Sequence, residues 1–299
     1  MKRSDNSDRT APHFGAAVSS SRRARPTRLN FGLLAAHAIT WALFIFVAAP
    51  VFVVIAGAFL DPTLLGVTSE RWAGRDASAF LGLEWFRYVF DLYWRSIQFS
   101  LLLAGLSVVI CIMISLPAAQ VIARSRSAAA QILEEATLLP LSVPGIALSI
   151  GLIQGYAVIR GKWWLILCGH LLYTVPLMVR VLTNTLRSFD LERLQLAAQS
   201  LGANRWQRLF FIVIPNLRHS IVIGSLLVFA ISWGEFNISF LLNTPLNQTY
   251  PAALYATYTG NSFAVSSAAT TIFLAVIVPV LLALQWFGGR EFTRLEQAA

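Results

Sequence analysis

Long apolar runs recur along this chain, and each is long enough to cross a lipid bilayer. About 20 consecutive, mostly apolar residues span the hydrocarbon core as a helix. Only 12% of the residues are charged, which is about half the share found in a soluble domain. We therefore expect an all-α membrane protein with six transmembrane helices, over residues 31–60, 97–123, 132–159, 163–182, 221–242 and 265–287.

The third apolar segment, 132–159, is the least regular of the six, because proline and glycine interrupt it. Proline also occurs inside other segments. Such breaks are tolerated in membranes where neighbouring helices or water bond the freed backbone groups. The prolines therefore indicate a packed bundle around a pathway, in which the third segment either flexes or is simply kinked; they are Pro117, Pro140, Pro144, Pro176 and Pro279.

Basic residues are distributed unequally between the two sides of the membrane. If the six segments cross in turn, 17 of the 23 Lys and Arg residues fall on one side and six on the other. Short loops rich in Lys and Arg stay in the cytoplasm. Both termini are therefore predicted to be cytoplasmic, with residues 1–30 as a disordered basic tail and residues 288–299 as a C-terminal tail.

Residues 31–96 are predicted to hold the first transmembrane helix and a long outer loop. The alternative to that helix is a signal peptide, whose apolar region runs over about 7–15 residues, whereas the segment 31–60 is far longer. The outer loop is rich in aromatic residues, which are typical of a helix lying at a membrane surface. They are Trp72, Trp85, Tyr88, Tyr93 and Trp94.

A polar and basic insert, residues 190–215, separates the fourth and fifth apolar segments. Gly202 stands where a residue in the left-handed conformation would end a helix. Asn204 and Gln207 have the spacing of a capping box that would start a second helix, and Pro215 is expected to end or kink that helix. We expect two short amphipathic helices joined by a sharp bend at the inner face of the membrane.

The spacing within this insert resembles the signature loop of the permease subunits of binding-protein-dependent ABC importers. That family's pattern is Glu-Ala-Ala, three residues, Gly, nine residues, Ile, one residue and Leu-Pro. The insert keeps every spacing, with leucine in place of the glutamate and isoleucine in place of the leucine. It reads Leu196-Ala197-Ala198, Gly202, Ile212 and Ile214-Pro215. From the residues alone, a hairpin that only orients the neighbouring spans explains the insert equally well.

The resemblance implies a type I (MetI-like) permease, with a five-helix core over residues 97–287 and an added N-terminal helix. In that family the loop forms a coupling helix that docks on a cytoplasmic ATPase, where small residues allow close approach and aromatic residues act as apolar anchors. The implied coupling residues are Ala197, Ala198, Gly202, Ala203, Trp206, Phe210, Ile212 and Pro215.

The same resemblance implies the partners and the location of the chain. The partners are two ATP-binding subunits, which carry the ATP and magnesium, a second permease that is a different chain, and a periplasmic or extracellular solute-binding protein. The location is the bacterial cytoplasmic membrane. The replacement of the motif glutamate by Leu196 puts one polar contact with the ATPase in doubt.

The sequence holds no motif for chemistry of its own. The phosphate-binding pattern G-x-x-x-x-G-K-[ST], zinc-ligand spacings and the nucleophile pattern G-x-S-x-G are all missing. The net charge of +9 is spread beside apolar runs and indicates no nucleic-acid surface. We expect a transport subunit and not an enzyme, with no catalytic residue, metal or cofactor on this chain. His170, deep in the fourth segment, is expected to serve packing or hydrogen bonding.

A carboxyl group inside an apolar segment is costly and calls for an explanation. Glu235 lies in the fifth segment beside Ser232, Trp233 and Asn237. It either pairs with a polar group inside the bundle or lines a substrate pathway that prefers cationic cargo. Two further carboxyl groups near the start of the third segment face the pathway, the ATPase or solvent; they are Glu134 and Glu135.

The segment from Glu235 to Thr259 resembles the polyamine (spermidine/putrescine) branch of these permeases. The resemblance is carried by an acidic residue followed by Phe236 and by a Thr-x-Pro-x-x-x-Tyr stretch from Thr249 to Tyr255. It implies a small polar or cationic cargo. Ferric ion, aminoethylphosphonate or a sugar remain alternatives, as does an ion-coupled secondary transporter, which would need inverted repeats or a relay of buried carboxylates.

Overall fold

The structure is a computed structural model that describes residues 31–59, 83–125, 127–188, 191–260 and 263–298. These residues form helices joined by short turns, with no strand among them. Five of their helices are long and apolar enough to cross a membrane. They are α1 (Phe31–Gly57), α2 (Glu84–Arg124), α6 (Trp163–Ser188), α9 (Ile214–Gly234) with the turns that precede it, and α12 (Phe263–Ala298).

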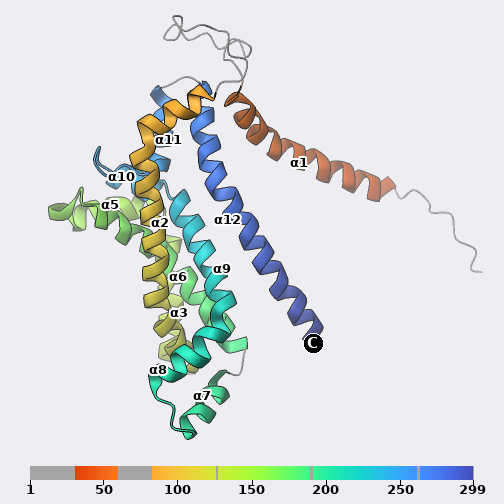
Figure 1. Cartoon of the computed structure of the whole chain (residues 1–299), viewed down its shortest axis with the longest axis vertical. Coiled ribbons are helices and arrows are strands. Elements are labelled where there is room, and N and C mark those ends of the chain that lie inside the picture. The colour runs from red at the N-terminus through yellow and green to blue at the C-terminus, as the bar shows by residue number, and fades with distance from the viewer. Residues whose placement is uncertain (1–30, 60–82, 126, 189–190, 261–262, 299) are drawn as a thin grey trace, which may run out of the picture. The chain divides into compact units, whose positions relative to one another are not determined.

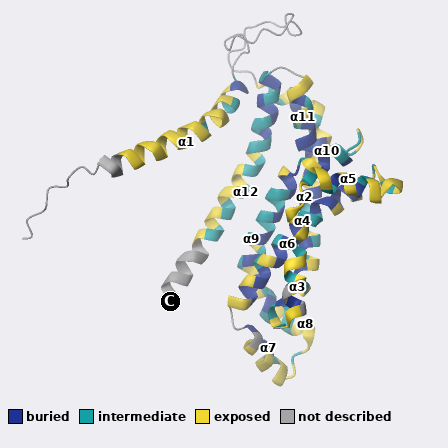
Figure 2. Ribbon diagram, turned by 180° about the vertical axis from the view of Figure 1, so that it is seen from behind, coloured by how far each residue is buried: buried dark blue, intermediate teal, exposed yellow. Residues whose placement is uncertain are grey.

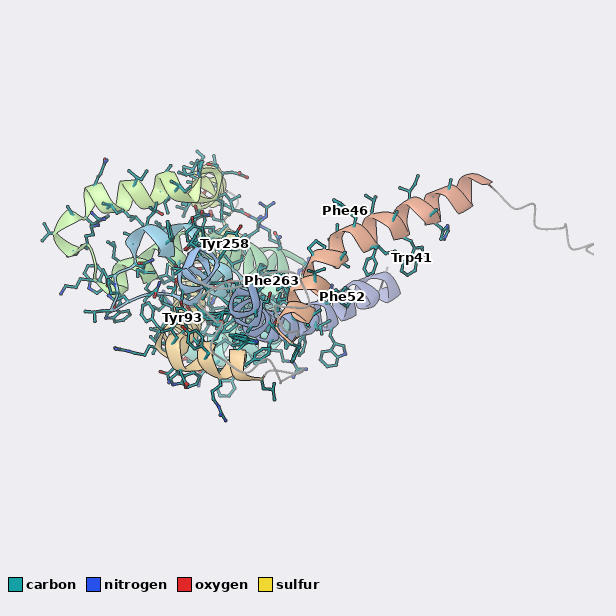
Figure 3. The ribbon with its side chains drawn as sticks, turned by 90° about the horizontal axis from the view of Figure 1, so that it is seen from above. Trp41, Phe46, Phe52, Tyr93, Tyr258 and Phe263 are labelled. Atoms are coloured by element: carbon teal, nitrogen blue, oxygen red, sulfur yellow. The ribbon has the colours of Figure 1, made fainter. Side chains whose placement is uncertain are left out.

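The chain divides into two compact units, residues 1–49 and residues 50–299. In the first unit, the described residues belong to α1, which is apolar all round. Its side chains are exposed, including Trp41 at 61% and Phe46 at 77%, and these two project from different sides of the helix (Figure 3). A helix that is apolar on every side matches a lipid environment. The predicted basic tail, residues 1–30, and Trp72 lie outside the described residues.

In the second unit, α6 packs against α2 and α9 along much of its length and is the most buried of the spanning helices (Figure 2). Small residues allow this close packing. A Cβ added at Gly224 in α9 would collide with Met178 of α6, and one at Gly169 in α6 would collide with Ile238. The helices therefore meet at positions where only glycine fits without movement of a neighbour.

The predicted third span is not one continuous helix. It is divided into α3 (Ala128–Thr137), α4 (Leu139–Ser142), α5 (Gly145–Gly155) and a 3₁₀ turn, η3 (Ala157–Ile159). The longest piece has only 11 residues, and α5 runs across the direction of α2 (Figure 1). Proline explains the division: Val143, which precedes Pro144, is extended at φ −87° and ψ 128°, because proline disfavours the α conformation in the residue before it.

The predicted fifth span is also interrupted. α9 ends at Gly234, Glu235 has an extended backbone at φ −70° and ψ 116°, and a short helix, α10 (Asn237–Leu242), follows. By contrast, the prolines within α1, α2, α6 and α12 do not end those helices; they are Pro50, Pro117, Pro176 and Pro279. Four of the six predicted spans are thus confirmed as single helices, and two are divided.

Helix ends differ from the predicted bounds outside the bundle core. α2 begins at Glu84 and is continuous over 41 residues, so the aromatic residues placed in an outer loop lie on its first turns; they are Trp85, Tyr88, Tyr93 and Trp94. α12 continues to Ala298, through the residues assigned to a C-terminal tail. In the view along the bundle, Tyr93 marks the first part of α2 and Phe263 marks the start of α12 (Figure 3).

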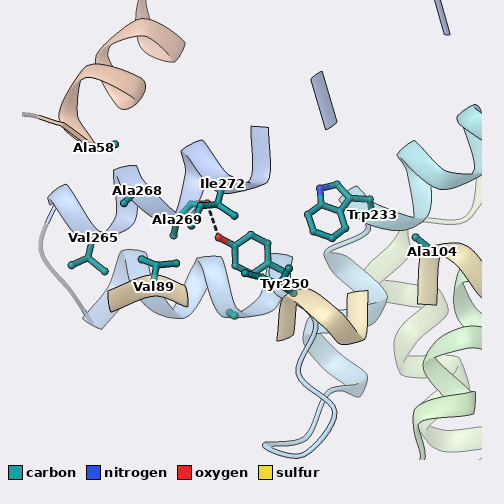
Figure 4. Close-up of a cluster of buried hydrophobic side chains, with 11 residues drawn as sticks. Ala58, Val89, Ala104, Trp233, Tyr250, Val265, Ala268, Ala269 and Ile272 are labelled. Carbon is teal, nitrogen blue, oxygen red and sulfur yellow. Dashed lines mark hydrogen bonds between the residues drawn. The ribbon is translucent and has the colours of Figure 1, made fainter. Parts of the chain in front are cut away.

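An aromatic core joins α9, α12 and α11 (Tyr250–Gly260). Trp233 is fully buried, and its ring centroid lies 5.9 Å from that of Tyr250 and 5.7 Å from that of Phe273. The Tyr250 hydroxyl donates a hydrogen bond of 2.8 Å to the carbonyl oxygen of Ala269 (Figure 4). This core fixes the position of α11 at one end of the bundle.

Candidate functional site: the insert and the buried polar network

The first helix of the insert, α7 (Leu191–Ser200), ends in a glycine bend. Gly202 has a φ of +85°, in the left-handed region that other residues occupy only with strain. The N–H of Ala203 donates to the carbonyl of Ala198 at 2.9 Å, and the N–H of Gly202 donates to that of Gln199 at 3.0 Å. These two bonds define a Schellman motif, which confirms the predicted end of the first helix and the sharp bend.

The second helix of the insert, α8 (Arg205–Arg208), begins at the predicted capping box. The Asn204 side-chain oxygen accepts from the N–H of Gln207 at 2.8 Å, and the Gln207 side-chain oxygen accepts from the N–H of Asn204 at 2.8 Å. Two backbone N–H groups at the helix start, which would otherwise lack an acceptor, are thereby bonded. The capping box predicted from the sequence is therefore confirmed.

Pro215 was expected to end or kink the second helix, and the structure shows that it does not end it. A π-helical turn, η4 (Leu209–Val213), joins α8 directly to α9, and Pro215 lies in the first turn of α9. Proline crowds the carbonyl four residues before it, and the wider π turn relieves that crowding. The insert is therefore continuous with a spanning helix.

The insert presents apolar side chains that no described residue covers. Trp206 is 66% exposed and Phe210 is 57% exposed, and their rings stack with centroids 6.2 Å apart. Near them lies an open hollow of about 440 Å³ with a lining of mixed polarity. It is lined by Ala198, Leu201, Gly202, Ala203, Gln207, Phe211 and Ile212.

The structure brings together most of the residues predicted to contact an ATPase. Ala198, Gly202, Ala203 and Ile212 line the hollow, while Trp206 and Phe210 form the stacked pair. Of the other two, Ala197 and Pro215 are exposed but do not line the hollow. α7 and α8 lie at the opposite end of the bundle from α11 (Figure 1), so this surface is separated from the aromatic core.

Sequence reasoning missed two residues of this surface, Leu201 and Phe211, which are 89% and 78% exposed. Leu201 directly precedes the glycine of the bend. Phe211 stands within the π turn, which rotates side chains away from the positions that a 3.6-residue period predicts. The signal for this π turn that the sequence contained is Pro215, four residues after Phe211.

A second site is a chain of buried polar groups between α2, α6 and α9–α10. His170 is 2% exposed. Its Nδ1 lies 2.7 Å from the Ser232 hydroxyl, and its Nε2 lies 3.0 Å from the Ser239 hydroxyl. Ser232 in turn donates to Ser107 at 3.3 Å. This confirms that His170 serves hydrogen bonding, since a neutral imidazole has one donor and one acceptor nitrogen.

Glu235 joins the same network at the break between α9 and α10. It is 9% exposed. Its two carboxylate oxygens accept the N–H groups of Ile238 and Ser239, each at 2.9 Å, and one of them lies 3.7 Å from His170 Nε2. A carboxylate that bonds the free N–H groups of a helix start is favoured by the helix dipole. Glu235 therefore holds the first turn of α10 in place.

The four residues predicted to line a pathway do not form one surface. Ser232 and Glu235 belong to the buried network, whereas Trp233 points into the aromatic core of α9, α11 and α12 (Figure 4). Asn237 is exposed and lies close to Gly145 of α5, where an added Cβ would come within 2.8 Å of the asparagine Cβ.

The two carboxyl groups near the start of the predicted third span, those of Glu134 and Glu135, lie on α3. Glu134 accepts two hydrogen bonds from Arg187 at the end of α6, at 3.1 and 2.7 Å. This paired geometry ties α3 to the end of a spanning helix. Glu135 is exposed. The described residues contain no group of His, Cys, Asp and Glu that could hold a metal ion.

Long apolar helices with a bent, partly apolar insert at one end are typical of a multi-pass membrane protein. The model of the family "Binding-protein-dependent transport system inner membrane component" matches residues 111–291. The chain belongs to this family, and it is a multi-pass protein of the bacterial inner membrane. Membership of this family argues against the alternative prediction of an ion-coupled secondary transporter.

Two curated relatives carry different cargo names. The chain is 39% identical over 117 residues to the molybdenum transport system permease protein ModB of Escherichia coli strain K12, covering 37% of this chain and 50% of ModB. It therefore spans only half the length of that relative. It is 24% identical over 250 residues to the putative 2-aminoethylphosphonate transport system permease protein PhnV of Salmonella typhi, covering 82% of this chain and 94% of PhnV.

A solved structure shares the fold. A bacterial ABC transporter involved in the import of the acidic polysaccharide alginate contains a chain that matches with a TM-score of 0.66 at 15% identity, covering 87% of this chain and 98% of that one. None of these comparisons supports the polyamine branch. That resemblance rested on a few residues between Glu235 and Tyr255, and the structure uses one of them, Glu235, for internal bonds.

Proposed function

We propose that this chain is the permease subunit of an ATP-driven importer, in which the insert is the docking surface for a separate ATP-binding subunit. One observation carries this proposal: the glycine bend and the capping box fix the turn between two helices at one end of the bundle, which expose a stacked aromatic pair and an open hollow. Buried aromatic anchors commonly dominate the energy of an interface.

The connection from the insert to the bundle supports a mechanical role. The insert runs through η4 into α9 without a loop, and α9 packs against both α2 and α6. A movement of the docking surface would thus reach the buried network and the α9–α10 break as a shift of packed helices. ATP binding would close the ATPase pair, bring two such inserts together and open the pathway to the outside.

The rest of the complex follows from the family. Two ATP-binding subunits would hold the ATP and magnesium, a second permease chain would complete the pathway, and a solute-binding protein would deliver cargo from the outside. The excess of Lys and Arg on the side of the insert supports its placement in the cytoplasm with both termini. A small polar solute is the proposed cargo class, because the relatives are named for molybdenum and 2-aminoethylphosphonate.

A co-purification experiment tests the docking surface. The tagged full chain is expressed in its own host, solubilised and captured, and the recovered chains that contain G-x-x-x-x-G-K-[ST] are quantified. The double variant Trp206→Ala and Phe210→Ala is expected to recover such a chain at least about tenfold less well, since anchor residues contribute about 2 kcal/mol or more.

The matched control is Leu246→Ala. Leu246 is 79% exposed but lies in the turn between α10 and α11, away from the insert. Its recovery of the ATP-binding chain should equal that of the unchanged protein. Equal recovery by the double variant would reject the docking surface.

A further inference from the structure

A polar cavity of about 390 Å³ lies where the insert meets the end of α2. It shares no lining residue with the hollow beside the aromatic pair, and none of its lining residues is among the predicted coupling residues. Three of the lining residues are arginines and three are glutamines. The lining is Gln120, Arg124, Gln195, Gln199, Arg205, Arg208 and Leu209.

The cavity holds positive charge that no described carboxylate neutralises. Arg124 and Arg205 make no hydrogen bond or ion pair with the described residues, and Arg208 bonds only the neutral side chain of Gln199, at 2.6 Å. Three guanidinium groups around one cavity repel each other. An anion placed among them would remove that repulsion and accept several charge-assisted hydrogen bonds.

One buried polar atom at this cavity lacks a partner. The Nε of Arg208 is buried and makes no hydrogen bond with the described residues. A buried donor without an acceptor costs about 1–3 kcal/mol, so this group points to an acceptor that occupies the cavity. Gln195, which is only 5% exposed, also lines the cavity.

The cavity is expected beyond the apolar part of the bilayer. The apolar run of α2, residues 97–123, is long enough to cross the hydrocarbon core, which is about 30 Å thick. Arg124 follows that run as the last residue of α2, so we expect it at the level of the lipid headgroups or beyond them. Guanidinium groups match the planar geometry of phosphate oxygens.

We propose that this cavity is a phosphate-binding site at the junction of the insert and α2. Arg124, Arg205 and Arg208 supply the charge, and Gln195 supplies a neutral donor. The phosphate comes either from an anionic phospholipid of the adjoining leaflet or from free inorganic phosphate. Bound phosphate ties the insert to the end of a spanning helix.

The test measures the thermal unfolding midpoint of the purified full chain in nanodiscs. In phosphatidylcholine nanodiscs the probe is added inorganic phosphate, and in a second set the probe is phosphatidylglycerol mixed into the bilayer. A ligand that binds only the folded state raises the midpoint. At least one probe is expected to raise it, and Arg205→Gln or Arg208→Gln should weaken the effect about tenfold in probe concentration.

The matched control is Arg218→Gln, which removes an exposed arginine of α9 that does not line the cavity. Its response should equal that of the unchanged chain. A response to phosphatidylglycerol alone identifies the lipid as the source, and a response to phosphate identifies the free anion. Because Arg205 is exposed, its variant is expected to fold, which circular dichroism checks.

Two outcomes would overturn the proposal. One is that neither probe distinguishes Arg205→Gln and Arg208→Gln from the control. The other is that these variants lose only the recovery of the ATP-binding chain and keep their full response to both probes, which would assign the arginines to an acidic surface of that partner. The test needs no ATPase, so its failure and the failure of the docking surface are distinguishable.

Discussion

His170 of α6 and Ser232 of α9 form a buried hydrogen bond of 2.7 Å between two spanning helices. The same ring bonds Ser239 of α10 on its other side. One side chain thus connects α6 to both helices that flank the α9–α10 break. This explains how a break inside a predicted span remains fixed, because the polar groups exposed by the break are bonded inside the bundle.

Replacing His170 should therefore destabilise the bundle. His170→Leu leaves Ser232 and Ser239 without their shared partner, and we expect a loss of about 1–3 kcal/mol in the free energy of unfolding. Unfolding of the purified chain in detergent by increasing denaturant measures it. Cys168→Ala, an exposed position on the same helix, is the control and should change little. A stable His170→Leu protein would show that the network is dispensable.

Glu235→Gln tests the carboxylate at the start of α10. In the carboxamide an NH2 donor replaces one of the two carboxylate oxygens, so one of the N–H groups of Ile238 and Ser239 would face a donor in place of its acceptor. We expect a loss of about 1–3 kcal/mol in stability, together with slower uptake of the solute carried by the host's binding protein. Recovery of the ATP-binding chain should be unchanged, since Glu235 lies outside the insert. Normal stability with slow uptake would instead favour a direct contact with cargo.

Gly202→Ala tests the bend of the insert. No atom lies within 4 Å of an added Cβ, so the cost comes only from the positive φ and amounts to about 1–2 kcal/mol. The bend should loosen, and recovery of the ATP-binding chain should fall. Gly151→Ala is the control, because an added Cβ there also meets nothing within 4 Å and Gly151 lies inside the helix α5. If both variants recover the partner equally, the bend has no part in docking.

Gly224→Ala tests the contact between α9 and α6. Its Cβ would collide with the sulfur of Met178, so we expect a loss of about 1–3 kcal/mol from overpacking. Met178→Ala alone leaves a cavity and costs about 2–5 kcal/mol. The double variant should be more stable than the sum of the two losses predicts, as measured by a double-mutant cycle. Strict additivity would show that these residues do not press on each other.

Several local features could be predicted because their causes are local. The end of α7 at Gly202 follows from the backbone freedom of glycine, and the start of α8 follows from the Asn204–Gln207 pair. Predictions of helix continuity failed where contacts with residues distant in the sequence decide whether a helix continues. The division of the third segment depends on whether neighbours replace the backbone bonds that Pro140 and Pro144 remove, and the same residue type leaves α6 continuous at Pro176.

The sequence by itself determined the long apolar helices, their separation by a basic insert and the bend within that insert, because hydrophobic length, charge and glycine conformation act over a few neighbouring residues. Only the tertiary structure decided which polar groups meet. Ser107 and His170 are far in the sequence from each other and from the neighbouring Ser232 and Glu235, yet all four form one network. The physical reason is that a buried polar group needs a partner, and the packing of the helices chooses which one.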